Sequence, residues 1–149
     1  MQLDHTDYQI LRLLTENSRI QWKELGEQIH MTGQAVGNRI KKLEDGGIIR
    51  SYSLIVDELK LGLAYTAFVV LTMNTADHKS FVTFITERNE VIEAHRISGE
   101  GCYHLTLKVR SQEQLNDFLN ALLAHGNYGL NLSIQTVKQS GALAAAQEE

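Results

Sequence analysis

The feature of the sequence that most constrains its fold is a series of three short amphipathic segments that ends at a pair of glycines. Apolar residues recur at helical spacing before Asn17, again over residues 22–29, and again over about residues 33–45. The third segment stops at Gly46-Gly47, a typical helix end. Asp4 can cap the first helix and Thr32 the third. Three short helices with a tight turn before the third predict a helix-turn-helix.

The hydrophobic period changes after the glycine pair. Residues 48–56 are rich in β-branched side chains and predict a strand, which would form a wing beside the helices. Residues 59–62 look like a junction between two units. We therefore predict that residues 1–63 form a winged helix-turn-helix DNA-binding domain.

The third helix has two distinct faces on a helical wheel at about 100° per residue. Val36, Ile40 and Leu43 gather on the core side. Side-chain amides on the opposite side can bond adenine edges, while lysine and arginine contact guanine or phosphates. Any solvated helix also has a polar face, so the prediction depends on the whole set of elements around it. The predicted DNA-binding residues are Thr32, Gln34, Asn38, Arg39, Lys41 and Lys42, with Arg50 from the wing.

The rest of the chain repeats one plan. Residues 64–73, 91–98, 103–110 and 130–138 are predicted strands, and residues 77–88 and 112–124 are predicted helices. This is the ferredoxin-like βαββαβ order, so the whole chain is expected to be α+β. Both helices should cover one face of an antiparallel sheet. The strand at 64–73 is apolar on both sides, so we expect a second subunit to cover the other face. Residues 139–149 are predicted to be a flexible tail.

Charge and composition set limits on these predictions. The net charge is −4, and residues 1–63 carry 8 Lys+Arg against 9 Asp+Glu. A basic face is the usual mark of a nucleic-acid binder, so DNA binding must rest on the local placement of charge. No apolar run has the length of a membrane span, and no signal peptide is visible. With Cys102 as the single cysteine, we expect a cytoplasmic protein that does not bind a membrane.

The residues that carry these patterns resemble the Lrp/AsnC, or feast/famine, family of bacterial and archaeal regulators. The resemblance lies in the spacing of Leu3-Asp4, Asp7, Ile10-Leu11, Ser18-Arg19-Ile20, Glu24-Leu25-Gly26, Met31-Thr32, Val36, Arg39-Ile40-Lys41-Lys42-Leu43-Glu44 and Gly47-Ile48-Ile49, and continues through residues 64–138. It implies a sequence-specific transcriptional regulator that binds double-stranded DNA as a homodimer, assembles further to a tetramer or octamer, and responds to a small effector such as an amino acid.

The turn between the two βαβ halves is a candidate effector site. Its two glycines permit a positive φ and close backbone approach, which alone predicts only a turn. In the family that the chain resembles, a Gly-x-x-Asp-Tyr loop at this place helps to bind the effector between neighbouring dimers. Cys102 stands where that family usually has aspartate, which removes a carboxylate that could pair with an ammonium group. The resemblance implies effector contacts from Ser98, Gly99, Glu100, Gly101, Cys102 and Tyr103.

Two other classes of protein were weighed. A metal-responsive winged-helix repressor could use His95, Cys102 and His104 as ligands, but these residues have no recognisable metal-ligand spacing. An enzyme could use Ser98, Cys102 and His104 as nucleophile and base, but Ser98 lies in no nucleophile-elbow motif and no oriented acid partner is evident. We therefore expect no catalytic residues, no bound metal and no cofactor.

Overall fold

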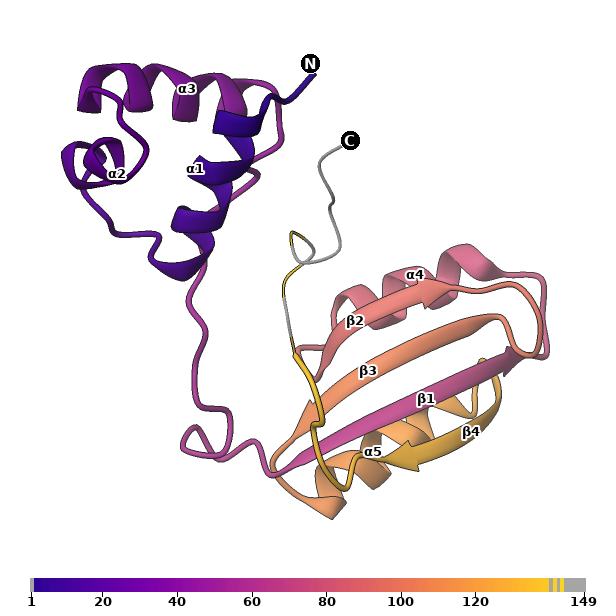
Figure 1. The fold of residues 1–149 in the computed structure, drawn as a ribbon. Helices are drawn as coiled ribbons and strands as arrows, with labels where there is room; N and C mark the ends of the chain where they lie inside the picture. Colours follow the sequence, from indigo (N-terminus) through magenta and orange to yellow (C-terminus); the bar gives the residue numbers. More distant parts are fainter. Residues whose placement is uncertain (1, 140, 142, 144–149) are drawn as a thin grey trace. The chain divides into compact units, whose positions relative to one another are not determined.

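The computed structural model describes residues 2–139, 141 and 143 of the chain (Figure 1). It divides into two compact units, one of Met1–Ile55 with Lys138–Glu149 and the other of Val56–Val137. The predicted tail at 139–149 falls mostly outside the described residues. Among the helices that the structure describes, none is long and apolar enough to cross a membrane.

The first unit contains the three predicted helices, α1 (His5–Glu16), α2 (Trp22–Gln28) and α3 (Gly33–Asp45). A reciprocal capping box starts α1, because the Asp7 N–H donates to Asp4 at 2.9 Å and the Asp4 N–H donates to Asp7 at 3.1 Å. The Thr32 hydroxyl accepts from the Ala35 N–H at 3.2 Å and starts α3. Fully or almost fully buried side chains from all three helices form one core, namely Ile10, Leu14, Leu25, Val36, Ile40 and Leu43.

The predicted wing strand is absent: residues 48–56 form no strand in the structure. Leu54 is 83% exposed and Ile55 is 99% exposed. A strand is stabilised by hydrogen bonds to a neighbour, and β-branched composition reports only how well a residue fits a sheet that already exists. The described residues pair no strand with this segment, so it runs as extended chain. The first unit is therefore a helix-turn-helix without a formed wing.

The second unit confirms the βαββαβ prediction. Its elements are β1 (Tyr65–Met73), α4 (His78–Thr86), β2 (Val91–Arg96), β3 (Tyr103–Val109), α5 (Gln112–Leu122) and β4 (Gly126–Leu132). The strands form one antiparallel sheet in the order β2-β3-β1-β4. Both helices lie on the same face of it (Figure 1).

The last strand lies earlier in the chain than residues 130–138, where it was predicted. The start of the strand was not predicted because it contains residues of low strand propensity, namely Gly126, Asn127 and Gly129. Pairing with β1, from Met73 opposite Gly126 to Ala67 opposite Leu132, forms the strand in spite of this composition. An added Cβ at Gly126 would lie 2.2 Å from the Thr72 carbonyl oxygen, so only glycine fits there.

The two faces of the sheet differ in burial. Ala67, Val69 and Leu71 of β1 are fully buried under the helices. Phe68 and Val70 point to the other face, which we call the open face, and both are only partly buried there. The Lys108 ammonium on this face forms an ion pair with Glu58, which lies in the chain just before β1. A turn of this unit's own chain therefore contacts part of the open face.

Candidate DNA interface and effector loop

The outer face of α3 brings four of the predicted DNA-binding residues together. The Gln34 side-chain amide donates to the Asn38 amide oxygen at 3.3 Å, one helical turn away, and both side chains are exposed. Lys41 and Lys42 follow on the next turn and are also exposed. The helix therefore presents two adjacent amides and two cations on the side away from its core.

The Arg39 side chain forms hydrogen bonds within the first unit. Its guanidinium donates to the two Asp4 carboxylate oxygens at 2.8 and 2.9 Å and to Asp7 at 2.8 Å. The hydrogen bond from Arg39 holds the pKa of Asp4 below its ordinary value, and the same carboxylates raise the pKa of Arg39. Arg39 therefore joins α3 to the first turn of α1, so a contact with guanine or phosphate would compete with two carboxylates.

Thr32 also has a structural partner, since its hydroxyl oxygen caps α3. The side chain remains exposed, and a hydroxyl that accepts one hydrogen bond can still donate another. Thr32 lies at the start of the helix whose outer face carries Gln34. A role in capping and a contact with DNA are therefore compatible at this position.

Two glycines fix the geometry of the helix-turn-helix. The Met31 N–H donates to the Gly26 carbonyl at 2.8 Å, and an added Cβ at Gly26 would lie 2.4 Å from the Met31 carbonyl oxygen. At Gly37 in the middle of α3, an added Cβ would lie 2.6 Å from the Trp22 ring. The absence of a side chain at Gly37 therefore lets Trp22 of α2 lie against α3, an arrangement that helical periodicity alone did not reveal.

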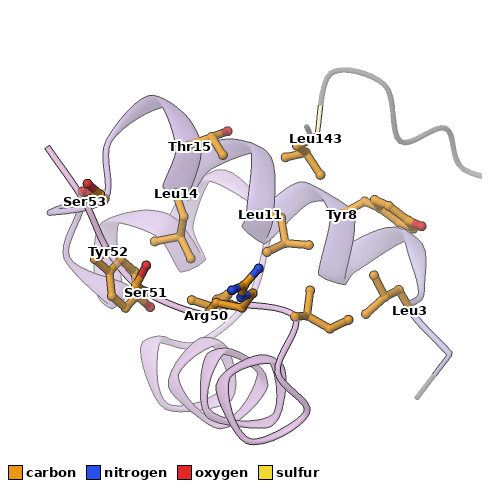
Figure 2. A pocket seen from close by; sticks show the side chains of 13 residues that line it. Leu3, Tyr8, Leu11, Leu14, Thr15, Arg50, Ser51, Tyr52, Ser53 and Leu143 are labelled. Carbon is orange, nitrogen blue, oxygen red and sulfur yellow. The ribbon is translucent and has the colours of Figure 1, made fainter. Parts of the chain in front are cut away.

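Arg50 lies outside the outer face of α3. It is exposed on the extended segment that follows the helix, beside α1 (Figure 2). The Tyr52 hydroxyl in the same segment donates to the Glu44 carboxylate at 2.8 Å. Partial burial and this hydrogen bond raise the pKa of Tyr52 to about 12. The segment is thereby tied to the last turn of α3.

The predicted effector loop is the tight connection between β2 and β3. Gly99 and Gly101 have φ values of 97° and 91°, in the region that favours glycine. The Cys102 N–H donates to the Leu71 carbonyl at 2.6 Å, which ties the loop to the end of β1. An added Cβ at Gly101 would lie 2.5 Å from Val70, so the loop passes directly over β1.

The six residues of the predicted site have three different environments. Ser98, Gly99 and Glu100 are exposed, whereas Gly101 and Cys102 are partly buried. Tyr103 is only 5% exposed and faces the helices, where its hydroxyl lies 2.9 Å from His78 Nδ1 and its ring centroid lies 4.5 Å from that of Phe81. The structure therefore separates the Tyr103 side chain from the exposed tip of the loop.

The residues named for a metal site do not converge. His95 lies opposite His104 across β2 and β3, and its ring nitrogen Nε2 lies 2.9 Å from the Glu93 carboxylate. Throughout residues 2–139, 141 and 143, no three His, Cys, Asp or Glu side chains form a group that could hold a metal ion. The arrangement gives the metal-responsive alternative no support.

Comparison with known proteins identifies both units. Residues 3–44 match the AsnC-type helix-turn-helix domain, and residues 66–143 match the Lrp/AsnC ligand binding domain. The transcriptional regulator LrpB of Bacillus subtilis is 61% identical over 139 residues, which cover 93% of each chain. LrpA of the same organism is 41% identical over 89% of this chain and 98% of its own.

Solved structures agree with these matches. B. subtilis LrpC superimposes with a TM-score of 0.89 at 31% identity, over 94% of this chain and all of its own. The regulator NMB0573 of Neisseria meningitidis, solved as an L-Met complex, superimposes with a TM-score of 0.88 at 27% identity. That match covers 93% of this chain and 94% of the Neisseria chain.

Proposed function

We propose a mode of operator reading for this chain, which belongs to the Lrp/AsnC family of DNA-binding transcriptional regulators. The outer face of α3 enters the major groove, where Gln34 and Asn38 read base edges and Lys41 and Lys42 contact phosphates. The observation that carries the proposal is the exposed, hydrogen-bonded pair of Gln34 and Asn38 on the side of α3 away from its core. Arg39 acts by positioning the helix through its carboxylate partners.

Two further residues take part in this proposal at the edge of the interface. Thr32 donates its hydroxyl hydrogen to a phosphate near the start of α3 while its oxygen caps the helix. Arg50 contacts the DNA backbone from the extended segment after α3, where its side chain is exposed. Because the operator is chromosomal DNA, we place the protein in the cytoplasm.

The reading of bases is tested by the double variant Gln34→Ala/Asn38→Ala. Each bidentate contact contributes about 1–3 kcal/mol of discrimination, so preference for the protein's own promoter over a scrambled duplex should fall at least tenfold. Lys41→Ala should instead weaken binding to both duplexes alike and reduce the salt slope by about one. Fluorescence anisotropy at several salt concentrations measures both effects.

A matched control lies in the other unit. Gln112→Ala/Asn116→Ala removes the same two residue types at the same spacing from the exposed side of α5, and should leave DNA binding unchanged. A Gln34→Ala/Asn38→Ala protein that still prefers its promoter would rule out base reading by this face. Equal losses in the two double variants would also rule it out.

We further propose that the protein acts as a homodimer that assembles to a tetramer or octamer. Support comes from the open face, where Phe68 and Val70 are only partly buried in the single chain. Two helix-turn-helix units in one assembly could read half-sites about one helical turn apart. Assembly would also place two copies of the Lys41 and Lys42 cations on one duplex, so binding would rest on their local placement in a chain of net charge −4.

The effector in this proposal is a small molecule, such as an amino acid, that binds at the loop of residues 98–103. The Neisseria relative that was solved with L-Met supports this class of ligand. In this chain, the Glu100 carboxylate is exposed and can pair with an ammonium group, whereas Cys102 has no carboxylate. The positive-φ glycines leave the loop backbone open to close approach. Tyr103 supports the loop from inside the core.

Light scattering after size exclusion tests assembly and effector response together. The wild-type protein should have at least twice the 16.8 kDa mass of the chain, and one member of a panel of amino acids, methionine included, should change that mass. Phe68→Glu should reduce the mass, because a charge on a buried interface is costly. Val82→Glu, at a side chain 46% exposed on α4, is the control. A wild-type monomer, or equal masses for the two variants, would contradict the proposed interface.

A further inference from the structure

The chain's single tryptophan lies directly on the DNA-reading helix. The helix that carries it, α2, packs against α3 (Figure 1). An added Cβ at Gly37 would lie 2.6 Å from two carbon atoms of the Trp22 ring, so the ring rests on the α3 backbone. One turn earlier, an added Cβ at Gly33 would lie 3.1 Å from the Lys23 Cα. Two glycines at helical spacing therefore make room on α3 for the start of α2.

The side of α3 that carries Trp22 borders the face proposed to read DNA. Gly37 and Lys41 are four residues apart and so lie along one side of the helix. The residue before Gly37 is the fully buried Val36, and the residue after it is the exposed Asn38. Successive residues are about 100° apart around a helix. Trp22 therefore lies between the core and the base-reading side chains, one turn before Lys41.

The Trp22 side chain is only partly satisfied by its contacts within the chain. It is 54% exposed, although the glycine that admits it weakens the interior of α3 relative to alanine. The indole has one N–H donor, and no residue that the structure describes accepts a hydrogen bond from it. Tryptophans of this kind, apolar on one side and with a polar edge in water, are enriched at binding interfaces.

We propose that the Trp22 indole N–H donates to a phosphate of the operator when α3 lies in the major groove. The proposal rests on the operator reading by α3 proposed above. An α-helix with its side chains is about 10–12 Å across and the major groove is about 12 Å wide, so a ring on the flank of the helix lies at the edge of the groove, where the phosphates are. The contact positions the protein on the duplex without reading its sequence.

A variant that removes the donor but keeps an aromatic ring tests the contact. Trp22→Phe should weaken binding about tenfold for the protein's own promoter and for a scrambled duplex alike, because it removes one hydrogen bond to a charged group. The neutral indole releases no counterion, so the salt slope should stay at its wild-type value, unlike that of Lys41→Ala. Far-UV circular dichroism checks that the variant folds. Unchanged affinity, or a loss confined to the promoter duplex, would overturn the phosphate contact.

Acrylamide quenching tests the contact in the protein without any substitution. Because Trp22 is the single tryptophan, its fluorescence reports on this site alone. A saturating amount of unlabelled promoter duplex should lower the quenching constant about twofold or more, since a close contact excludes solvent from the ring. The control, Trp22→Phe/Val82→Trp, moves the tryptophan to a position on α4 that is 46% exposed, and its quenching should be the same with and without DNA. Quenching of Trp22 that is unaffected by bound duplex would overturn the proposal.

The outcomes for Trp22 and for base reading are distinguishable. Fluorescence anisotropy shows independently that the duplex is bound. If it is bound while Trp22 stays fully accessible to acrylamide, the indole contact fails and base reading by Gln34 and Asn38 is unaffected. If Gln34→Ala/Asn38→Ala keeps its preference for the promoter while the duplex protects Trp22, base reading fails and the indole contact stands.

Discussion

Gly26→Ala is expected to destabilise the helix-turn-helix by about 1–3 kcal/mol, and to weaken operator binding as a result. The new Cβ would lie 2.4 Å from the Met31 carbonyl oxygen, a backbone atom in the turn that the Met31 N–H closes onto Gly26. The turn must therefore open to admit one methyl group. The chain's single tryptophan, Trp22, lies in this unit, so its fluorescence during urea unfolding follows this unit separately.

The matched control is Gly37→Ala. Its Cβ would lie 2.6 Å from the ring of Trp22, which is 54% exposed and can swing outward. Alanine also favours the interior of a helix over glycine by about 1 kcal/mol, which offsets the cost of moving the ring. We expect unfolding close to wild type, with a shifted emission maximum. If Gly37→Ala were as damaging as Gly26→Ala, the close backbone contact in the turn would not be the cause.

Phe81→Ala is expected to lower the free energy of unfolding of the second unit, Val56–Val137, by about 3–5 kcal/mol. Phe81 is fully buried, and its ring centroid lies 4.5 Å from that of Tyr103 and 5.4 Å from that of His125. Its removal leaves a cavity directly behind the first residue of β3, which supports the predicted effector loop. Far-UV circular dichroism in urea should show an earlier transition for this unit, and the response to the effector should weaken.

The neighbouring residue provides the comparison. Val82 follows Phe81 on α4 but is 46% exposed, and Val82→Ala should change stability by no more than about 0.5 kcal/mol. The Trp22 fluorescence transition should be the same in both variants, because Trp22 belongs to the other unit. Similar losses from Phe81→Ala and Val82→Ala would show that burial at Phe81 does not dominate the stability of this unit.

Much of the fold could be predicted because its local signals agree with one another. Each helix of the first unit combines an apolar stripe with a recognisable end, and the structure has all three. The two errors concern strands. Residues 48–56 have strand composition without a partner, and β4 has a partner without strand composition. Pairing decides a strand, and pairing is not a local property of the sequence.

In the candidate site, too, features set by local sequence could be predicted and features set by tertiary contacts could not. The amides and lysines on the outer face of α3 follow from helical periodicity alone. The partners of Arg39 are Asp4 and Asp7, more than 30 residues earlier in the chain, so only the tertiary structure could reveal them. Tyr103 was assigned to the effector loop by resemblance. A local signal for its burial did exist, because every second residue of β3 from Tyr103 through Leu105 and Leu107 is apolar and faces the core.

The unpaired segment after α3 has a consequence for handling the protein. Residues 51–56 carry no charge, and the chain has no proline to interrupt an added strand. An exposed stretch of this kind is a template for strand pairing between molecules, and so a site of aggregation. Solubility should therefore depend on what covers Leu54 and Ile55, and preparations that are kept from assembling should be the first to precipitate as they are concentrated.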